Sequence, residues 1–148
     1  IFLISTNPGE PPRPLDKVAS GGELSRIALA LKTCVAQTSK AKAAARTLVF
    51  DEVDSGVGGG AAEIVGRRLK QLAAFDQVLC VTHLPQIAGF ADHHYHIEKR
   101  ETDGRTVAAI EELTGEARVR EIGRMLSGQR LTDEALRHAE QLIRLASA

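Results

Sequence analysis

The sequence is poor in aromatic residues and in cysteine. It has no tryptophan and one tyrosine, and aromatic residues make up only 3% of its 148 residues. Its two cysteines, Cys34 and Cys80, are far apart and lack the Cys-x-x-Cys spacing of a zinc or redox site. Both lie in apolar stretches, so we expect buried thiols in a reducing compartment. No apolar run approaches the roughly 18 residues that cross a bilayer, which argues against a membrane-spanning helix.

The sequence also lacks net charge. Its 19 lysines and arginines balance 19 aspartates and glutamates, so no global basic field indicates nucleic acid binding. DNA contact by this segment is neither supported nor excluded. The first residues lack the pattern of a signal peptide, so we expect none here, and because the first residue is Ile1 rather than methionine, we expect a piece of a longer chain. The 43% of apolar residues is enough to form the core of one domain over residues 1–148.

Hydrophobic periodicity and turn residues predict the order of the elements. In the first half we expect a strand at 1–5, a loop at 7–14, a helix at 20–38, a connector at 39–46 and a strand at 47–50. A glycine-rich turn at 55–60, a helix from 61 to 72 and a strand at 77–82 follow. The rest is predicted to form hairpin strands at 93–99 and 105–111 and helices at 115–126 and after 132. The strand–helix–strand order indicates an α/β fold with a mainly parallel sheet. The strands at 47–50 and 77–82 are continuously apolar, so we expect them to be buried on both faces.

The helix that begins after Ser20 has the features of an anion-binding helix start. Ser20 and Glu23 form a capping box, and Gly21 and Gly22 remove side chains that would keep a phosphate away from the backbone amides. An ordinary capped helix is the alternative. Two glycines in a first turn cost about 1 kcal/mol each relative to alanine, which favours a function. The similar run 126–129 lacks the second glycine and ends a helix, so we interpret Gly128 as a C-cap.

Two carboxylates follow the first apolar strand. Asp51 and Glu52 come at its carboxyl end, where α/β sheets place ligands. Because adjacent strand residues point to opposite faces, we expect the two acids to have different roles. Asp51 is suited to hold Mg²⁺ through a water, and Glu52 is suited to orient or deprotonate a water beside a γ-phosphate. The alternative is a pair of solvated acids at a strand end.

A second interpretation of this region is a dinucleotide-binding turn. Residues 56–61 fit the loose G-x-G-x-x-G/A pattern after a strand and before a helix. The acids between the strand and these glycines would repel a pyrophosphate, however. We therefore give this interpretation less weight than the magnesium and water site.

Histidine follows the second apolar strand. His83 lies beside the expected phosphate position, where a neutral or charged imidazole can donate to the γ-phosphate. A histidine bonded only to backbone is the alternative. His93, His94 and His96 lack the cysteine or carboxylate partners of a zinc site, and we expect them to be solvated or packed on the hairpin.

Four segments in this order resemble motifs of the ABC ATPases. Residues 18–26, Val-Ala-Ser-Gly-Gly-Glu-Leu-Ser-Arg, are similar to the ABC signature, and residues 48–52, Leu-Val-Phe-Asp-Glu, to a Walker B strand. Asp54 and Ser55 begin a segment similar to the loop that crosses to a partner, and residues 82–86 resemble the switch-histidine segment. The exact residues of these motifs, together with residues 6–10 upstream, resemble those of the SMC-like ABC ATPases that act in bacterial DNA double-strand-break repair.

The resemblance covers essentially the whole chain and implies the C-terminal lobe of an ABC-type head. Ser20, Gly21, Gly22 and Glu23 would then bind the ATP of an opposite head, and Asp54 and Ser55 would also be cofactor-binding residues. Asp51 would serve Mg²⁺, Glu52 the attacking water and His83 the γ-phosphate. The chain contains no G-x-x-x-x-G-K-[ST] phosphate loop, glutamine loop or long coiled coil, which in the family precede the point where this sequence begins.

The resemblance also implies partners and a place of action. The implied partners are an N-terminal lobe with the Walker A loop, a second head in a homodimer, and DNA bound through the complete protein. No membrane partner is expected. The location would be cytoplasmic, with the nucleoid. The segment alone is expected to be inactive. An ABC transporter subunit and a non-catalytic interaction module of the same fold are the alternatives.

Overall fold

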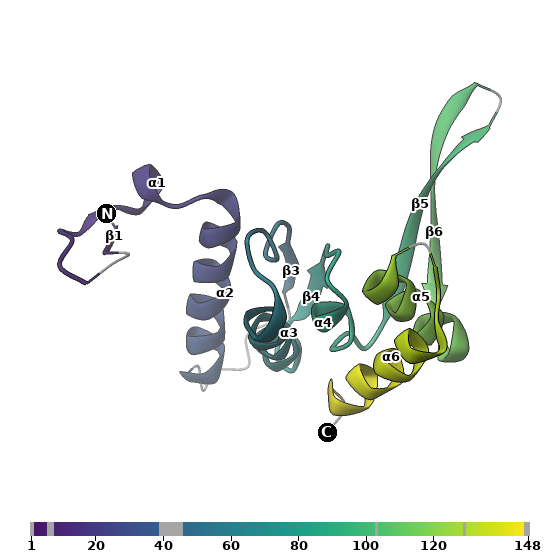
Figure 1. Ribbon diagram of the computed structural model, residues 1–148. Helices are drawn as coiled ribbons and strands as arrows, with labels where there is room; N and C mark the ends of the chain where they lie inside the picture. The colour runs from purple at the N-terminus through teal and green to yellow at the C-terminus, as the bar shows by residue number, and fades with distance from the viewer. Residues whose placement is uncertain (1, 6–7, 39–45, 103, 129, 147–148) are drawn as a thin grey trace.

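The computed structural model describes residues 2–5, 8–38, 46–102, 104–128 and 130–146. Its elements are β1 (Leu3–Ile4), β2 (Arg13–Pro14), α1 (Leu15–Val18), α2 (Gly21–Thr38), β3 (Thr47–Phe50), α3 (Gly59–Ala73), β4 (Gln77–Cys80), α4 (Pro85–Ala88), β5 (His94–Thr102), β6 (Arg105–Leu113), α5 (Gly115–Ser127) and α6 (Asp133–Ala146). From left to right, Figure 1 shows the N-terminal segment, the long α2, a central group around β3, β4, α3 and α4, and the β5–β6 hairpin with α5 and α6.

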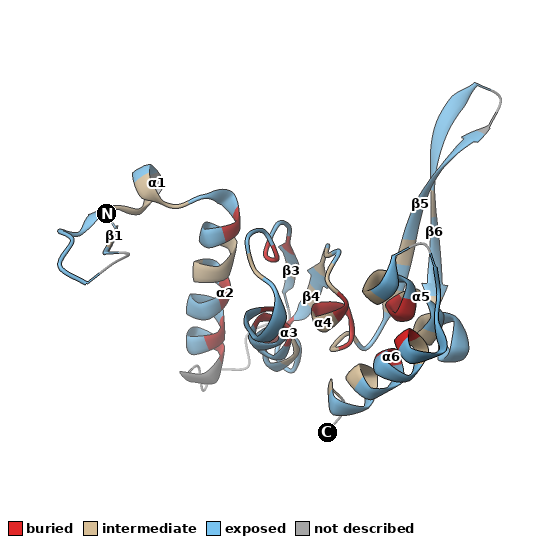
Figure 2. Cartoon of the chain, in the orientation of Figure 1, coloured by how far each residue is buried: buried red, intermediate tan, exposed pale blue. Residues whose placement is uncertain are grey.

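The centre of the chain is the predicted strand–helix–strand unit. β3 and β4 pair in parallel, from Thr47 opposite Gln77 to Phe50 opposite Cys80, and α3 connects them. The spacing of the apolar residues explains why α3 packs here, because its buried residues recur every three or four positions. These residues are Ala62, Val65, Leu69 and Leu72. They form one core with Phe50 and with Leu29 of α2, and Figure 2 shows the buried side of α2 facing α3.

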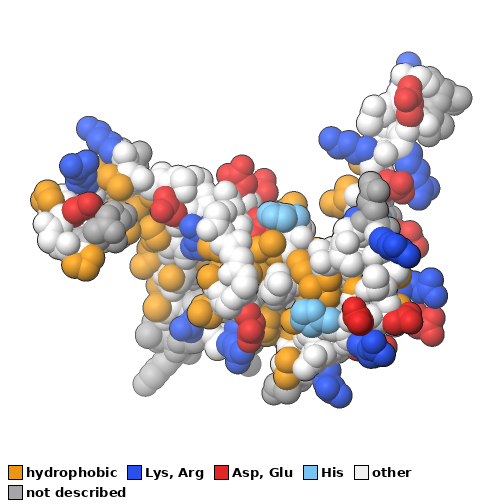
Figure 3. All heavy atoms as spheres, viewed as in Figure 1, with side chains coloured by type: hydrophobic (Ala, Val, Ile, Leu, Met, Phe, Trp, Pro, Cys, Tyr) orange, Lys and Arg blue, Asp and Glu red, His pale blue; other side chains and the backbone are white. Residues whose placement is uncertain are grey.

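The two central strands are not buried on both faces, and this expectation was wrong. Val49 is 66% exposed and Leu79 is 48% exposed, whereas Phe50 is buried. In the described part of the chain, α3 and α2 cover one face of the two-stranded sheet, and nothing covers the other. A continuous apolar run predicts that both faces are covered in the complete assembly, but it does not say by which segment. Figure 3 shows hydrophobic side chains across the central surface.

The N-terminal segment contains more regular structure than the sequence predicted. Part of the expected loop, Arg13–Pro14, forms a short antiparallel ladder with Leu3–Ile4, and the amide of Leu15 donates to the Phe2 carbonyl at 3.0 Å. The helical turn α1 was not predicted. Residues 1, 6–7 and 39–45, which include the ends of the expected strand and loop and most of the expected connector, lie outside the described residues.

The C-terminal part confirms the predicted hairpin and helix pair. β5 and β6 pair antiparallel from His94–Leu113 to Thr102–Arg105, and Gly104 takes the positive φ (70°) that such a turn requires. Gly128, with φ 76°, donates its amide to the Arg124 carbonyl and ends α5. The hydroxyl of Thr132 accepts the amide of Ala135 and begins α6. Both helices form a second core with α4 through Ala88, Ile122 and Ala139.

The prediction of two buried thiols is only partly met. Cys34 is exposed on α2, since its side chain lies away from the core face of the helix. Cys80 is half-buried at the end of β4, where burial, with the nearby charges of Asp54 and Asp51, raises its pKa to about 12. The Cys80 thiol therefore stays protonated near neutral pH and is a poor nucleophile. Among the described residues, no helix is both long and apolar enough to cross a bilayer.

An ion pair between half-exposed Arg46 and buried Asp76 joins the starts of the two central strands. Both carboxylate oxygens of Asp76 accept from the Arg46 guanidinium, at 3.1 and 2.8 Å, and Asp76 also accepts the Arg46 amide at 3.1 Å. The side chain of Asp76 is 4% exposed. The hydrogen bonds from the Arg46 side chain and backbone hold the pKa of Asp76 below its ordinary value. This pair therefore fixes where β3 and β4 begin relative to each other.

We expect this pair to make the chain sensitive to acid. Because the pKa of Asp76 is lower in the folded chain than in the unfolded chain, the unfolded state takes up a proton first as the pH falls. The stabilisation is then complete above the unfolded value of about 3.9 and is lost as the pH falls through the folded value. Urea unfolding at about pH 6 and about pH 3 measures this loss. Asp76→Asn should be less stable at the higher pH and show a smaller loss between the two; an equal loss would contradict the assignment.

Candidate functional site

The capping box at the start of α2 is formed as the sequence predicted. The Ser20 amide and hydroxyl both donate to Glu23 Oε2, at 2.7 and 2.8 Å, and the Glu23 amide donates to Ser20 Oγ at 3.4 Å. These bonds from Ser20 lower the pKa of Glu23, which is therefore charged near neutral pH. The Ser20 hydroxyl is thus already engaged with Glu23, and a phosphate would have to share it.

A close approach within the chain requires glycine at position 22, whereas the atom near Gly21 is the mobile end of the Glu52 side chain. A Cβ at Gly21 would lie 2.8 Å from Glu52 Oε2, and one at Gly22 would lie 2.7 Å from Ser55 Cβ and 2.9 Å from the Glu52 carbonyl. Contacts this short do not occur for real Cβ atoms. The cost of Gly22 therefore has a structural reason, which weakens the inference of function drawn from the two glycines; Gly21 has no such packing requirement, since the Glu52 carboxylate can turn aside. Gly21 is exposed and Gly22 is buried beneath the loop.

The paired carboxylates come just after β3 rather than on it. The strand ends at Phe50, Asp51 Oδ1 accepts the Glu52 amide at 2.9 Å, and Glu52 has φ 57°. A non-glycine residue with positive φ is uncommon and is concentrated at functional sites and turns. The expectation that strand alternation separates the two acids was therefore wrong, because the backbone has already turned. The turn itself directs Glu52 toward the start of α2.

Asp54 connects this loop to the histidine segment. Its Oδ2 atom accepts the Thr82 hydroxyl at 2.7 Å and the His83 amide at 2.9 Å, and lies 3.0 Å from His83 Nδ1. Burial by itself raises the pKa of Asp54, but these hydrogen bonds and the His83 charge together hold the pKa below its ordinary value. The Asp54 side chain is only 7% exposed and points inward to the His83 segment, so its cofactor-binding role stays a prediction from the sequence.

Two residues of α2 that hold the loop after β3 were not predicted from the sequence. The Ser25 hydroxyl donates to the Asp51 carbonyl at 2.9 Å, and Arg26 donates to the carbonyls of Ser55 at 2.6 Å and Val53 at 3.4 Å. Helical spacing could have revealed them. Positions 22, 25, 26 and 29 share one face, and a serine and an arginine on the face that buries Leu29 need partners elsewhere in the chain.

The ligands around Asp51 fit a magnesium ion that is shared with a nucleotide better than a metal ion held by protein ligands alone. The Asp51 side chain is exposed, and the Glu52 amide orients one of its oxygens. Mg²⁺ commonly uses one or two carboxylates together with waters and substrate phosphates. Within the described residues there is no group of three or more potential metal ligands, so a site here would depend on the nucleotide.

Of the three hairpin histidines, His93 is exposed, as expected, whereas His94 and His96 are partly buried near charged residues of α5. His93 Nδ1 lies 2.8 Å from Glu112 Oε1, and His96 Nδ1 lies 3.3 Å from Glu121 Oε1. His94 is half-buried; burial and the neighbouring Arg118 lower its pKa.

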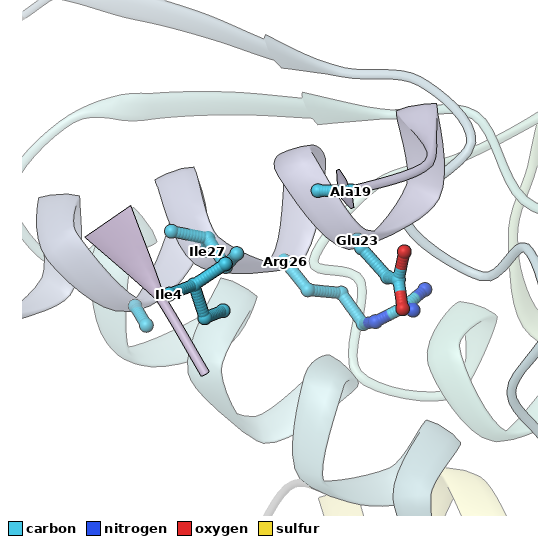
Figure 4. A pocket seen from close by; sticks show the side chains of 6 residues that line it. Ile4, Ala19, Glu23, Arg26 and Ile27 are labelled. Atoms are coloured by element: carbon cyan, nitrogen blue, oxygen red, sulfur yellow. The ribbon is translucent and has the colours of Figure 1, made fainter. Parts of the chain in front are cut away.

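A separate hollow of about 250 Å³ lies between the N-terminal segment and α2. Figure 4 shows Ile4 of β1 beside Ile27 of α2, with Glu23 and Arg26 together at one end. Its lining is mostly apolar, and neither Asp51, Glu52 nor His83 contributes to it. We therefore do not assign nucleotide binding to this hollow.

Comparisons with known proteins identify relatives over nearly the whole chain. It is 52% identical over 143 residues to the DNA repair protein RecN of Deinococcus radiodurans, which is 97% of this chain and 24% of that protein. It is 46% identical over 145 residues to RecN of Bacillus subtilis (98% and 24%) and 44% identical over 147 residues to RecN of Halalkalibacterium halodurans (99% and 25%). The chain thus spans about a quarter of the length of these relatives. No protein-family profile matches it.

A structural comparison confirms the fold. A solved structure from work on the ATP-driven dimerization and DNA-stimulated activation of SMC ATPases matches 86% of this chain and 81% of its own, with a TM-score of 0.50 and 21% identity. The predicted α/β fold is therefore confirmed. Over essentially its whole length, this chain is similar to a segment of the DNA repair protein RecN that makes up about a quarter of that protein, as the motifs predicted.

Proposed function

We propose that this chain is the signature-bearing lobe of an ATPase of the RecN type. The observation that carries the proposal is the meeting of three motifs at one edge of the central sheet. The start of α2 contacts Glu52 through Gly21, the Asp51 carbonyl accepts Ser25, and Asp54 in the same loop binds the His83 segment. The residues suited to phosphate, magnesium and water thus belong to one connected network.

Each residue has a distinct proposed role. Glu52 orients or deprotonates the water that attacks the γ-phosphate, and His83 contacts that phosphate. Asp51 holds Mg²⁺ through a water; the metal, when bound, neutralises charge on the triphosphate. Ser20, Gly21 and Glu23, which are exposed, contact the ATP of an opposite head with Ser55, and Gly22, which is buried, lets the loop pack closely beneath this helix start. Asp54 is not given a nucleotide contact, because its side chain points inward.

The exposed face of the central sheet is the place where the rest of the head would pack. Val49, Leu79 and Val81 are all about half exposed or more, which is a large loss of hydrophobic stabilisation for an isolated segment. We propose that the lobe with the Walker A loop covers this face and that residues 1–148 form one lobe. Two such heads then form a homodimer around ATP, and the complete protein binds and tethers DNA in double-strand-break repair in the cytoplasm, with the nucleoid.

Two other functions are less well supported. A transporter ATPase would share the three motifs, but the relatives found over 96–99% of this chain are DNA repair proteins. A non-catalytic module would not need Asp51, Glu52 and His83 together, nor a strained Glu52 in the loop between them.

We expect this chain alone to show no steady ATP turnover. The sequence contains no G-x-x-x-x-G-K-[ST] loop to hold the β- and γ-phosphates, so neither positioning nor charge stabilisation is complete. Phosphate release from the purified chain, compared with the longer protein at equal concentration, measures this difference. Turnover by the chain alone at the rate of the longer protein would contradict the proposed division of the site. Absence of turnover in both would contradict the proposed function itself.

A further inference from the structure

Three nitrogen or oxygen atoms lie within hydrogen-bond distance of one oxygen of the Asp54 carboxylate, Oδ2. They are Thr82 Oγ1 at 2.7 Å, the His83 amide nitrogen at 2.9 Å and His83 Nδ1 at 3.0 Å. The Thr82 oxygen itself accepts the Leu84 amide at 3.1 Å, so its own proton is directed to Asp54. Two of the three contacts are therefore donors whatever the state of the imidazole.

This arrangement leaves one role for His83 Nδ1. An oxygen that accepts from a hydroxyl and a backbone amide is held as a charged acceptor, and the pKa of Asp54 is lowered accordingly. A deprotonated Nδ1 would place a lone pair 3.0 Å from that oxygen, which is repulsive, whereas an Nδ1–H donates to it. The side chain of His83 is 76% exposed, so the opposite edge of the ring, with Nε2, is open to solution.

We propose that Asp54 is a positioning residue that holds His83 as the Nδ1–H tautomer, with Nε2 directed outward. The neutral ring then presents Nε2 as a hydrogen-bond acceptor, and only the charged ring presents a donor there. This revises the expectation that neutral and charged His83 can both donate to a phosphate. Asp54 thereby decides which kind of group His83 can contact. The consequence for ATP turnover rests on the proposed function, but the tautomer does not.

The tautomer can be measured directly on this chain. Ring nitrogens are labelled with ¹⁵N on all five histidines, and spectra are recorded about two pH units above the ordinary histidine value of about 6.5. His83→Gln identifies the signals of His83 by their loss. We expect the shift of a protonated nitrogen at Nδ1 and of an unprotonated nitrogen at Nε2. A protonated Nε2 in the unmodified chain overturns the proposal, without the need for any variant of Asp54.

Two variants at position 54 separate positioning from a merely structural role. Asp54→Asn keeps an acceptor oxygen for the three donors, so the Nδ1–H tautomer should remain. Asp54→Leu removes the acceptor, and His83 should lose its preference for Nδ1–H while the other four histidines keep their signals. Retention of the Nδ1–H tautomer in Asp54→Leu overturns the proposal. If this variant does not fold, the tautomer of the unmodified chain and of Asp54→Asn still decides the question.

Turnover in the longer protein tests the part that rests on the proposed function. Asp54→Leu should reduce ATP hydrolysis about 10²-fold, as expected when a contacting group loses its orientation, and Asp54→Asn should retain most of it. If the tautomer follows the prediction but neither variant changes turnover, Asp54 still positions His83, and the proposed contact of His83 with phosphate fails. If both the tautomer and the turnover are unaffected by Asp54→Leu, the positioning role fails.

Discussion

Glu52→Gln in the longer protein is expected to reduce ATP hydrolysis by about 10²–10⁴-fold, the usual contribution of a general base. Glutamine has nearly the same shape as glutamate, so the close packing of the Glu52 side chain on Gly21 should persist. It cannot accept a proton from the attacking water, however. ATP binding depends on other groups and should be unchanged. Phosphate release and nucleotide binding, measured on the same preparation, separate the two effects.

A matched control lies on α6. Glu140 is exposed on the middle of that helix and belongs to neither core nor to the loop after β3. Glu140→Gln makes the same chemical change and should leave turnover as it was. If Glu52→Gln and Glu140→Gln hydrolyse ATP at the same rate, Glu52 takes no part in water activation. Loss of ATP binding in Glu52→Gln would instead indicate that the loop has moved.

The sequence predicted helix ends and turns well where hydrogen bonds or backbone angles within a few residues determine them. The capping box at Ser20, the turn at Gly104, the C-cap at Gly128 and the N-cap at Thr132 are all formed. Each depends on hydrogen bonds or backbone angles within a few residues, which are visible in the sequence. The two-residue strands at the N-terminus were harder to predict, because their pairing depends on contacts between residues about ten positions apart.

The candidate site was predicted by residue type but not by geometry. The sequence correctly placed acids after one strand and a histidine soon after the next, because parallel strands bring their carboxyl ends to one edge. It could not predict that Glu52 leaves the extended conformation or that Asp54 points inward. Both depend on the approach of α2 to the loop and of β4 to β3, which are long-range contacts.

The close approach of α2 to this loop leads to a second large expected effect. Gly22→Ala places a Cβ 2.7 Å from Ser55 Cβ and 2.9 Å from the Glu52 carbonyl, so the loop or the helix must shift. Overpacking of this kind costs about 1–3 kcal/mol, which the better helix propensity of alanine offsets by about 1 kcal/mol. The shift also moves Glu52 away from the start of α2. We therefore expect lower stability of this chain and, in the longer protein, a loss of turnover as well.

Gly60 provides the matched control for this substitution. It lies in the first turn of α3 without a positive φ, and a Cβ there would meet nothing within 4 Å. Gly60→Ala should therefore leave stability unchanged or raise it by up to about 1 kcal/mol, the opposite direction from Gly22→Ala. Urea unfolding of the two variants measures both changes. Equal stability of the two would show that the loop yields without cost, so that packing does not require glycine at position 22.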